Sequence, residues 1–201
     1  MYSPVSFQLQ DDALIAQIIA ENSFGTLISN DESGLQCSHL PFDFNAQRQL
    51  LRCHMARANS QWRAFDAQTE VLAIFQGPHG YVSPRWYETK LAVPTWNYLA
   101  VHVYGVAKII EDDAEVEKLL VDLVAQYENA SENPWRLEAP ADWQKNLRRA
   151  IVGFEISISR IEAKAKMSQN RPAADVAGVI SGFESTGQDE LAAWMRRFHS
   201  E

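Results

Sequence analysis

From Trp96 to Ile110 the sequence reads Trp-Asn-Tyr-Leu-Ala-Val-His-Val-Tyr-Gly-Val-Ala-Lys-Ile-Ile, and this stretch indicates a β fold. Val101, Val103 and every second residue up to Ile109 form one series, which alternates with a second series that begins at His102. Successive side chains of a β-strand point to opposite faces, so a period of two is typical of a half-buried strand. The stretch therefore predicts a long strand.

Shorter strands are predicted on both sides of this one. The same alternation recurs from Val152 to Ile158, and four further apolar runs are bounded by polar residues or by glycine and proline. These runs are 24–29, 35–42, 50–55 and 71–75, with polar turns at 30–34 and 45–49. Neighbouring short strands joined by tight turns predict an antiparallel meander.

Helices are predicted between and after the strands. Asp11 or Asp12 can cap a first helix, and Asp112 or Asp113 can cap a second, because each precedes an apolar stripe at helical spacing. Further helical pieces are expected from Asn59 or Ser60, over 142–150, and from Asp175 onward, with a break at 185–187. About six strands without βαβ alternation predict a mainly β, α+β protein: a β-barrel with peripheral helices.

Composition limits the classes of function. The 201 residues are 46% hydrophobic and 22% charged, with a net charge of −8, which argues against a general grip on DNA phosphates. The two cysteines, Cys37 and Cys53, have neither metal-ligand spacing nor the density of a disulfide scaffold, so we expect a reducing, cytoplasmic location. We expect no signal peptide, no membrane helix and no interaction with a membrane.

Aromatic residues gather in two segments, 75–87 and 93–98, where glycine and proline alternate with tryptophan and tyrosine. Rigidly held rings suit a surface that lies against a flat, partly apolar ligand. A hydrophobic core crossed by strands, or a dimer interface, explains the same composition, and residue types alone slightly favour that explanation.

A first candidate for phosphate binding is the segment 54–62, where a strand end runs into a helix start. Free backbone N–H groups at such a start favour an anion, and Arg57 could hold a phosphate with two donors. An ordinary capped helix with a solvated arginine is the alternative. No glycine-rich phosphate loop is present.

A second candidate is the polar run at 164–172, whose serine, glutamine, asparagine and arginine could bind a heterocycle edge or a phosphate. The alternative is a helix terminus closed by Pro172, and the residue types alone favour it.

Other chemistry receives little support. The four histidines at 39, 54, 79 and 102 fall in predicted strands or at strand ends but form no paired metal motif, so we expect no metal site. No serine or cysteine has the setting of a catalytic nucleophile, which argues against a covalent hydrolase.

Taken together, the segments resemble the PaiB-type family, FMN-binding proteins described as negative transcriptional regulators. The resemblance runs nearly end to end and rests on these segments in this order: 21–26, 38–41, 54–62, 75–81, 93–98, 101–105, 151–154 and 167–171. Ser60 is a small departure, because the family pattern has proline there.

This resemblance implies the FMN-binding split β-barrel of pyridoxamine-phosphate oxidases, an antiparallel Greek-key type, with two flavins in a homodimer interface. It implies a barrel domain over 1–172 with a C-terminal helical appendage over 173–201. It also implies an FMN site, with the phosphate at 54–61, in which some residues come from the partner subunit. The implied site residues are Ser38, His39, Leu40, His54, Ala56, Arg57, Asn59, Gln61, Trp96, Asn97, His102, Ser168, Gln169, Asn170 and Arg171.

Two functions follow from the resemblance. The first is a regulatory flavoprotein whose effect on transcription is indirect, because the chain is acidic and shows no helix-turn-helix. The second is an FMN-dependent oxidoreductase that passes electrons from NAD(P)H to a small acceptor, with haem handling as a weaker variant. No catalytic residue is identified.

Overall fold

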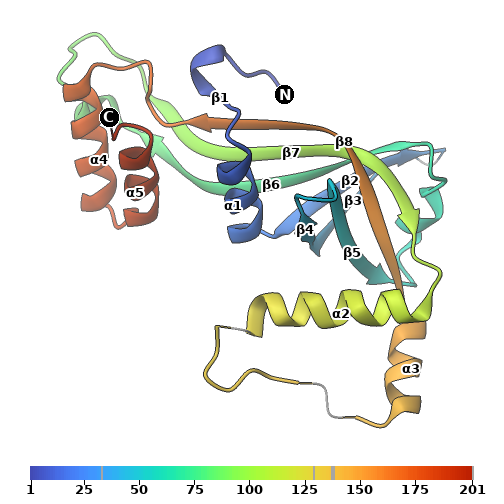
Figure 1. The fold of residues 1–201 in the computed structure, drawn as a ribbon. Coiled ribbons are helices and arrows are strands. Elements are labelled where there is room, and N and C mark those ends of the chain that lie inside the picture. Colours follow the sequence, from blue (N-terminus) through green and yellow to red (C-terminus); the bar gives the residue numbers. More distant parts are fainter. Residues whose placement is uncertain (33, 129, 137–138, 201) are drawn as a thin grey trace. The chain divides into compact units, whose positions relative to one another are not determined.

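The computed structural model describes residues 1–32, 34–128, 130–136 and 139–200 (Figure 1). The strands are β1 (Gln8–Leu9), β2 (Phe24–Asp31), β3 (Gly34–Pro41), β4 (Asp43–Asn45), β5 (Leu50–Ala56), β6 (Glu70–Val82), β7 (Thr95–Ile109) and β8 (Ile151–Lys166). The α-helices are α1 (Asp12–Glu21), α2 (Asp113–Glu128), α3 (Ala141–Arg149), α4 (Ala173–Ser185) and α5 (Asp189–Arg197). Three short 3-10 helices are η1 (Val5–Phe7), η2 (Ser60–Ala64) and η3 (Pro84–Trp86).

The strands of the described residues form one eight-stranded antiparallel sheet in the order β3-β2-β6-β7-β8-β5-β4, with β1 added beside β8. The path is open, since β3 and β4 are its two ends. This arrangement confirms the predicted class, a mainly β split barrel with peripheral helices. Ser33 of the predicted turn at 30–34 lies outside the described residues.

Two strands are much longer than the sequence predicts. β6 does not end at Phe75 but continues through Gly77 and Pro78 to Val82. Gly80 serves close packing there rather than a turn, because a Cβ at this position would lie 2.8 Å from side-chain atoms of both Phe183 and Leu191. β8 continues to Lys166, and its second half pairs with β1.

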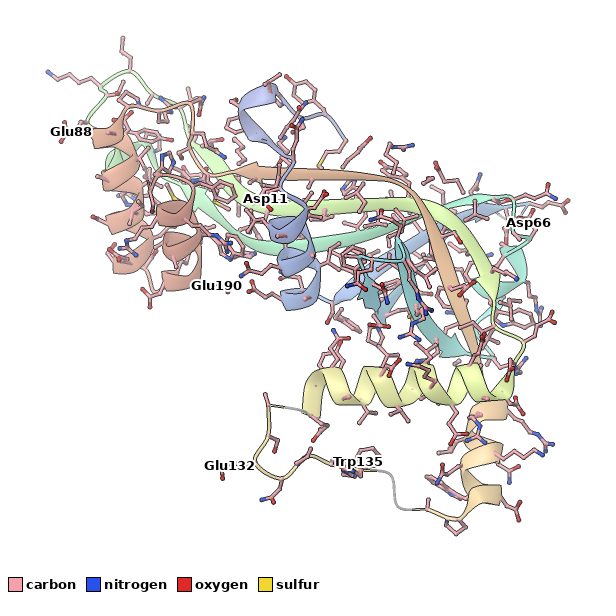
Figure 2. The ribbon with its side chains drawn as sticks, in the orientation of Figure 1. Asp11, Asp66, Glu88, Glu132, Trp135 and Glu190 are labelled. Atoms are coloured by element: carbon pink, nitrogen blue, oxygen red, sulfur yellow. The ribbon has the colours of Figure 1, made fainter. Side chains whose placement is uncertain are left out.

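The helix caps agree with the sequence at three places. Asp11 Oδ1 accepts a hydrogen bond from the Leu14 amide at the start of α1, where Figure 2 labels Asp11. Asp112 Oδ1 accepts from the Ala114 amide at the start of α2. Asn59 Oδ1 accepts from the Gln61 amide, although the helix that follows, η2, is a 3-10 helix of five residues. Asn59 is therefore the predicted cap of a shorter helix than expected.

The chain divides into two compact units, and strands β6, β7 and β8 contribute residues to both. The first unit contains Met1–Ile18, Gln76–Val101 and the chain from Glu162 onward, and the second contains Ile19–Phe75 and His102–Ile161.

The second unit has a core of large apolar side chains from β2, β5, β6 and β8. Phe42 packs edge to face on Phe75 with ring centroids 5.4 Å apart, and Phe65 lies 5.0 Å from Phe154. Cys53 belongs to this core: its thiol donates a hydrogen bond to the Pro41 carbonyl, and burial raises its pKa strongly. Cys37, on the exposed face of β3, is a free thiol.

In the first unit, α4 and α5 lie side by side (Figure 1) and share a buried face that includes Val179, Phe183 and Met195. Trp86 packs on the glycine positions of α4. Its ring lies 5.3 Å from that of Phe183, and a Cβ at Gly182 would lie 2.2 Å from the Trp86 ring. The lack of side chains at Gly178 and Gly182 is what allows η3 to approach the helix.

We predict that Gly178→Ala lowers the free energy of unfolding by about 1–3 kcal/mol, as overpacking does. Alanine favours a helix over glycine by about 1 kcal/mol, but its Cβ would lie 1.9 Å from the Trp86 carbonyl oxygen. Ser181→Ala, at an exposed position of the same helix, is the control and changes stability by less than about 0.5 kcal/mol. Urea unfolding measures both, and a Gly178→Ala variant as stable as wild type would contradict the packing argument.

Candidate functional site

The predicted site residues of β3 lie on two faces of the strand. Ser38 is half-buried, and its hydroxyl accepts a hydrogen bond of 2.8 Å from Asn59 Nδ2. Leu40 is buried on the same side of the strand. His39 points to the exposed side, where its Nδ1 lies 3.0 Å from Thr26 Oγ1 and its ring stacks with Phe24. A single ligand could touch all three only through the backbone of β3.

The Gln61 side chain connects η2 to the β2–β3 hairpin through hydrogen bonds. Its side chain is 1% exposed, and its amide nitrogen donates to the Leu27 carbonyl, Ser29 Oγ and the Gln36 carbonyl. Its Oε1 is buried without a hydrogen-bond partner among the described residues. Gln61 therefore organises the η2 start, and Asn59, which bonds both Ser38 and Gln61, helps it.

Arg57 makes its contacts with the main chain. Its Nε donates to the Arg149 carbonyl at 2.8 Å and its Nη2 to the Ile151 carbonyl at 2.7 Å, and its guanidinium lies 5.9 Å from the centre of the Trp62 ring. Two of the donors that the phosphate hypothesis requires thus hold the start of β8. Ala56, before it, is exposed at the end of β5.

His54 lies on the face of β5 that α2 covers. It pairs in register with Gly153, where a Cβ would lie 3.1 Å from Val116 of α2, and directly paired residues share a face. Burial lowers the pKa of His54, and its Nδ1 is buried without a partner among the described residues.

The same face of β5 carries an ionic network. The Arg52 guanidinium donates to Asp43 and, at 2.7 Å, to Asp122 of α2, which also accepts from Lys118. Burial alone would lower the pKa of Arg52 and raise that of Asp122, but the hydrogen bonds outweigh burial and shift both pKa values toward the charged forms. This network fixes α2 on the sheet.

His102 lies on β7, again in the second unit. Its ring centroid is 6.4 Å from that of Tyr104, and Arg160 stacks on Tyr104 with its guanidinium carbon 3.7 Å from the ring centre. His102 and Tyr104 are half-buried and Arg160 is exposed, so His102 has aromatic and cationic neighbours within its own unit.

Trp96 supplies an exposed aromatic surface in the first unit. The residue is 52% exposed, and its ring is flanked by His79 at 6.3 Å and Tyr81 at 6.1 Å, both from β6. A half-exposed indole held by two rings can stack with a flat heterocycle.

Asn97, Ser168 and Gln169 join the start of β7 to the turn after β8. Asn97 is fully buried and its amide donates to Ser168 Oγ at 2.9 Å, while Ser168 adopts a left-handed backbone with φ of 66°. Gln169 bonds the Met167 amide and the Ala165 carbonyl, so it holds the same turn. These three residues have packing partners of their own and position the exposed Asn170 beside them.

The polar run at 164–172 does not end a helix, as the residue types alone suggested. β8 continues to Lys166, and Pro172 is the residue that precedes α4. Proline suits a helix start, where its missing N–H is not needed.

Lys164 and Lys166 lie in the candidate segment 164–172 but are not among the site residues that the resemblance implies. Both lie on β8, two positions apart, and Arg171 follows in the turn. Arg171 stacks over the Tyr87 ring at 4.5 Å. The available signal was the pair of lysines at a spacing of two in a strand, which puts both on one face.

A cavity of about 660 Å³ lies elsewhere, between α2, residues 134–136 and α3. Leu120, Val124 and Trp135 line it, and Figure 2 labels Trp135 there. None of the predicted FMN-site residues lines this cavity. Among the described residues, no three histidine, cysteine or acidic side chains gather as a metal site, and no helix has the length and apolarity to cross a membrane.

Comparisons with known proteins agree with this fold. Residues 1–160 match the family described as "Putative FMN-binding domain". The protease synthase and sporulation protein PAI 2 of Bacillus subtilis is 39% identical over 189 residues, covering 92% of this chain and 90% of that protein.

Two solved structures share the fold at low identity. The FAD and haem binding protein of Mycobacterium smegmatis has a TM-score of 0.60 at 13% identity and covers 85% of this chain and 78% of that one. The flavocytochrome Anf3 of Azotobacter vinelandii has a TM-score of 0.59 at 15% identity, covering 85% and 74%.

The open antiparallel sheet and the family match over residues 1–160 together define a split-barrel protein of the FMN-binding class. Within that class, the chain belongs to the FMN-binding domain family, of the PaiB type that its sequence resembles. The predicted family and fold are confirmed, and FMN is the cofactor of the family, as predicted.

The residues present fit FMN. The half-exposed Trp96 ring offers a surface for the isoalloxazine, and the guanidinium of Arg171 makes no hydrogen bond within the described residues. Lys166 has a single hydrogen bond to the described part of the chain, to Thr95. Cations with unused donors suit the phosphate of the flavin.

We predict that His54 makes the fold sensitive to mild acid. Its folded-state pKa lies below the unfolded value of about 6.5. The unfolded chain therefore binds more protons below that pH. The stability that comes from keeping His54 neutral is fully present above about pH 6.5. It is lost as the pH falls through the folded-state pKa.

His54→Gln should show a smaller loss of unfolding free energy between pH 7 and 5.5 than wild type, measured by urea titration. His39→Gln, at an exposed position, is the control and keeps the wild-type loss. Equal acid losses in wild type and His54→Gln would contradict the assignment.

Proposed function

We propose that this chain is a cytoplasmic FMN-binding homodimer that affects transcription indirectly. The observation that carries the proposal is the family match over residues 1–160 on a split-barrel fold. The residues proposed to contact or position FMN are Ser38, His39, Leu40, His54, Ala56, Arg57, Asn59, Gln61, Trp96, Asn97, His102, Ser168, Gln169, Asn170 and Arg171.

The proposed site residues include some that can contact FMN and others that position their neighbours. The Trp96 ring and the Arg171 guanidinium present free groups to a ligand. Asn59, Gln61 and Asn97 act through others, because their side chains bond neighbouring residues. Bound FMN supplies one- or two-electron redox chemistry, while the protein binds and orients it.

Exposed apolar side chains in the first unit support the homodimer. Tyr81, Leu91, Val93 and Trp96 are 46%, 95%, 70% and 52% exposed, respectively. Interfaces are enriched in such aromatic residues. A second copy that covers them would shield this apolar surface from water.

The charges of the chain support an indirect effect on transcription. The net charge is −8, and the basic end of α5 is engaged within the protein. Arg196 pairs with Glu184, and Arg197 donates to Gln17 at 2.7 Å and stacks on Trp194. These two arginines are therefore not free to hold DNA phosphates.

We predict that the purified chain binds FMN more tightly than FAD, because it has basic groups for one phosphate and no dinucleotide fingerprint. Flavin fluorescence titration measures both affinities, and light scattering should give about twice the chain mass of 22.7 kDa. Equal or tighter FAD binding would contradict the proposal. Bleaching of bound FMN by NADPH or NADH would favour the alternative, an oxidoreductase.

We also predict no nanomolar, sequence-selective DNA binding near physiological salt, because the acidic chain repels phosphates. Anisotropy titrations of promoter fragments, with and without FMN, test this. A poly-basic peptide serves as the positive control, and tight selective binding by the protein would assign the regulatory effect to direct DNA contact.

A further inference from the structure

Three cationic side chains gather where β8 ends. Lys164 and Lys166 share one face of the strand, and Arg171 follows in the turn before α4. The two neighbours Lys164 and Arg171 act electrostatically on Lys166, so the three charges form one cluster. All three residues belong to the first unit.

The cluster has no acidic partner. Lys166 Nζ donates to Thr95 Oγ1, and Lys164 Nζ donates to the Tyr2 carbonyl at 3.1 Å. Arg171 rests on the Tyr87 ring, and no described residue accepts a hydrogen bond from its guanidinium. Within the described part of the chain, no carboxylate lies within ion-pair distance of these three side chains.

Two acids of this unit make contacts outside the cluster, although Asp175 Oδ2 is buried without a hydrogen-bond partner among the described residues. Asp175 Oδ1 accepts from the Glu88 and Thr89 amides at 2.9 and 3.0 Å, and Glu162 pairs with the amino group of Met1. Arg171 does feel the charge of Asp175, which lies in the first turn of α4. Three cations and the Asp175 carboxylate together carry a net positive charge.

The like charges of the cluster repel one another. Lys164 is only 7% exposed, and burial together with the charges of Lys164 and Arg171 lowers the pKa of Lys166. A bound dianion would relieve this repulsion, because each cation would gain an opposite charge. Lys166 and Arg171 also keep unused N–H donors, which form strong hydrogen bonds to phosphate oxygens.

We infer that Lys166 and Arg171 hold the phosphate group of FMN and that the buried Lys164 adds positive charge; this rests on the proposed function. Arg57, the arginine that the sequence favoured for that role, then acts as a positioning residue, because its Nε and Nη2 bind the carbonyls of Arg149 and Ile151. Its contribution is to the start of β8 rather than to the flavin.

The dissociation constant of riboflavin divided by that of FMN tests this inference, because riboflavin lacks only the phosphate. Flavin fluorescence titration of the full chain gives both constants. Lys166→Ala and Arg171→Gln should lower the ratio about 10-fold or more, the usual effect of losing a charge-assisted hydrogen bond. Lys166→Arg, which keeps the charge, should largely preserve it.

Lys108→Ala is the matched control, since it removes an exposed strand lysine outside the cluster, and its ratio should equal that of wild type. Arg57→Gln should weaken FMN and riboflavin equally. A variant that misfolds would also bind both flavins more weakly. In that case Lys166→Gln provides a milder second substitution.

Three results would overturn the inference: a wild-type ratio near one, unchanged ratios in both cluster variants, or a ratio that collapses in Arg57→Gln. In the last two cases wild type still binds FMN, so the proposed function stands. Failure of wild type to bind either flavin would instead reject the proposed function itself.

Discussion

The opposite orientation of successive side chains along each strand is the constraint on which the rest of this structure depends. It turns Trp96 outward and buries Asn97 beside it, and it sends Ser38 inward while His39 faces solvent. Neighbouring residues of one strand segment therefore have different roles. One residue packs the fold and the next is left to meet a ligand or a partner, so each exposed group is held by a buried neighbour one position away.

Local patterns were enough to predict most elements, because strand alternation and helix caps act over a few residues. The long extent of β8 could not be predicted in this way, since its second half is stabilised by β1, from the first ten residues. β6 was cut short for a similar reason. Gly80 and Pro78 are typical of turns, and only packing against Phe183 and Leu191 shows why glycine is needed inside the strand.

The structure gives some predicted site residues contacts that the sequence does not reveal. An arginine between a strand and a helix suggests an anion site, but the partners of Arg57 are carbonyls of residues 149 and 151, more than 90 positions away. No local pattern reveals such partners. Lys164 and Lys166 show the reverse case, because lysines in a strand are commonly solvated. Their proposed role depends on the lack of a carboxylate within ion-pair distance among the described residues, which only the folded unit shows.

The two thiols differ in a way that has a practical consequence. Cys53 is buried in the core, where its thiol bonds the Pro41 carbonyl and burial disfavours the thiolate, the form that reacts with electrophiles. Cys37 is exposed on β3. A maleimide dye or spin label should therefore attach to the unmodified native chain at one position. That gives the β2–β3 hairpin a built-in reporter for distance and mobility measurements, with no cysteine to remove or introduce.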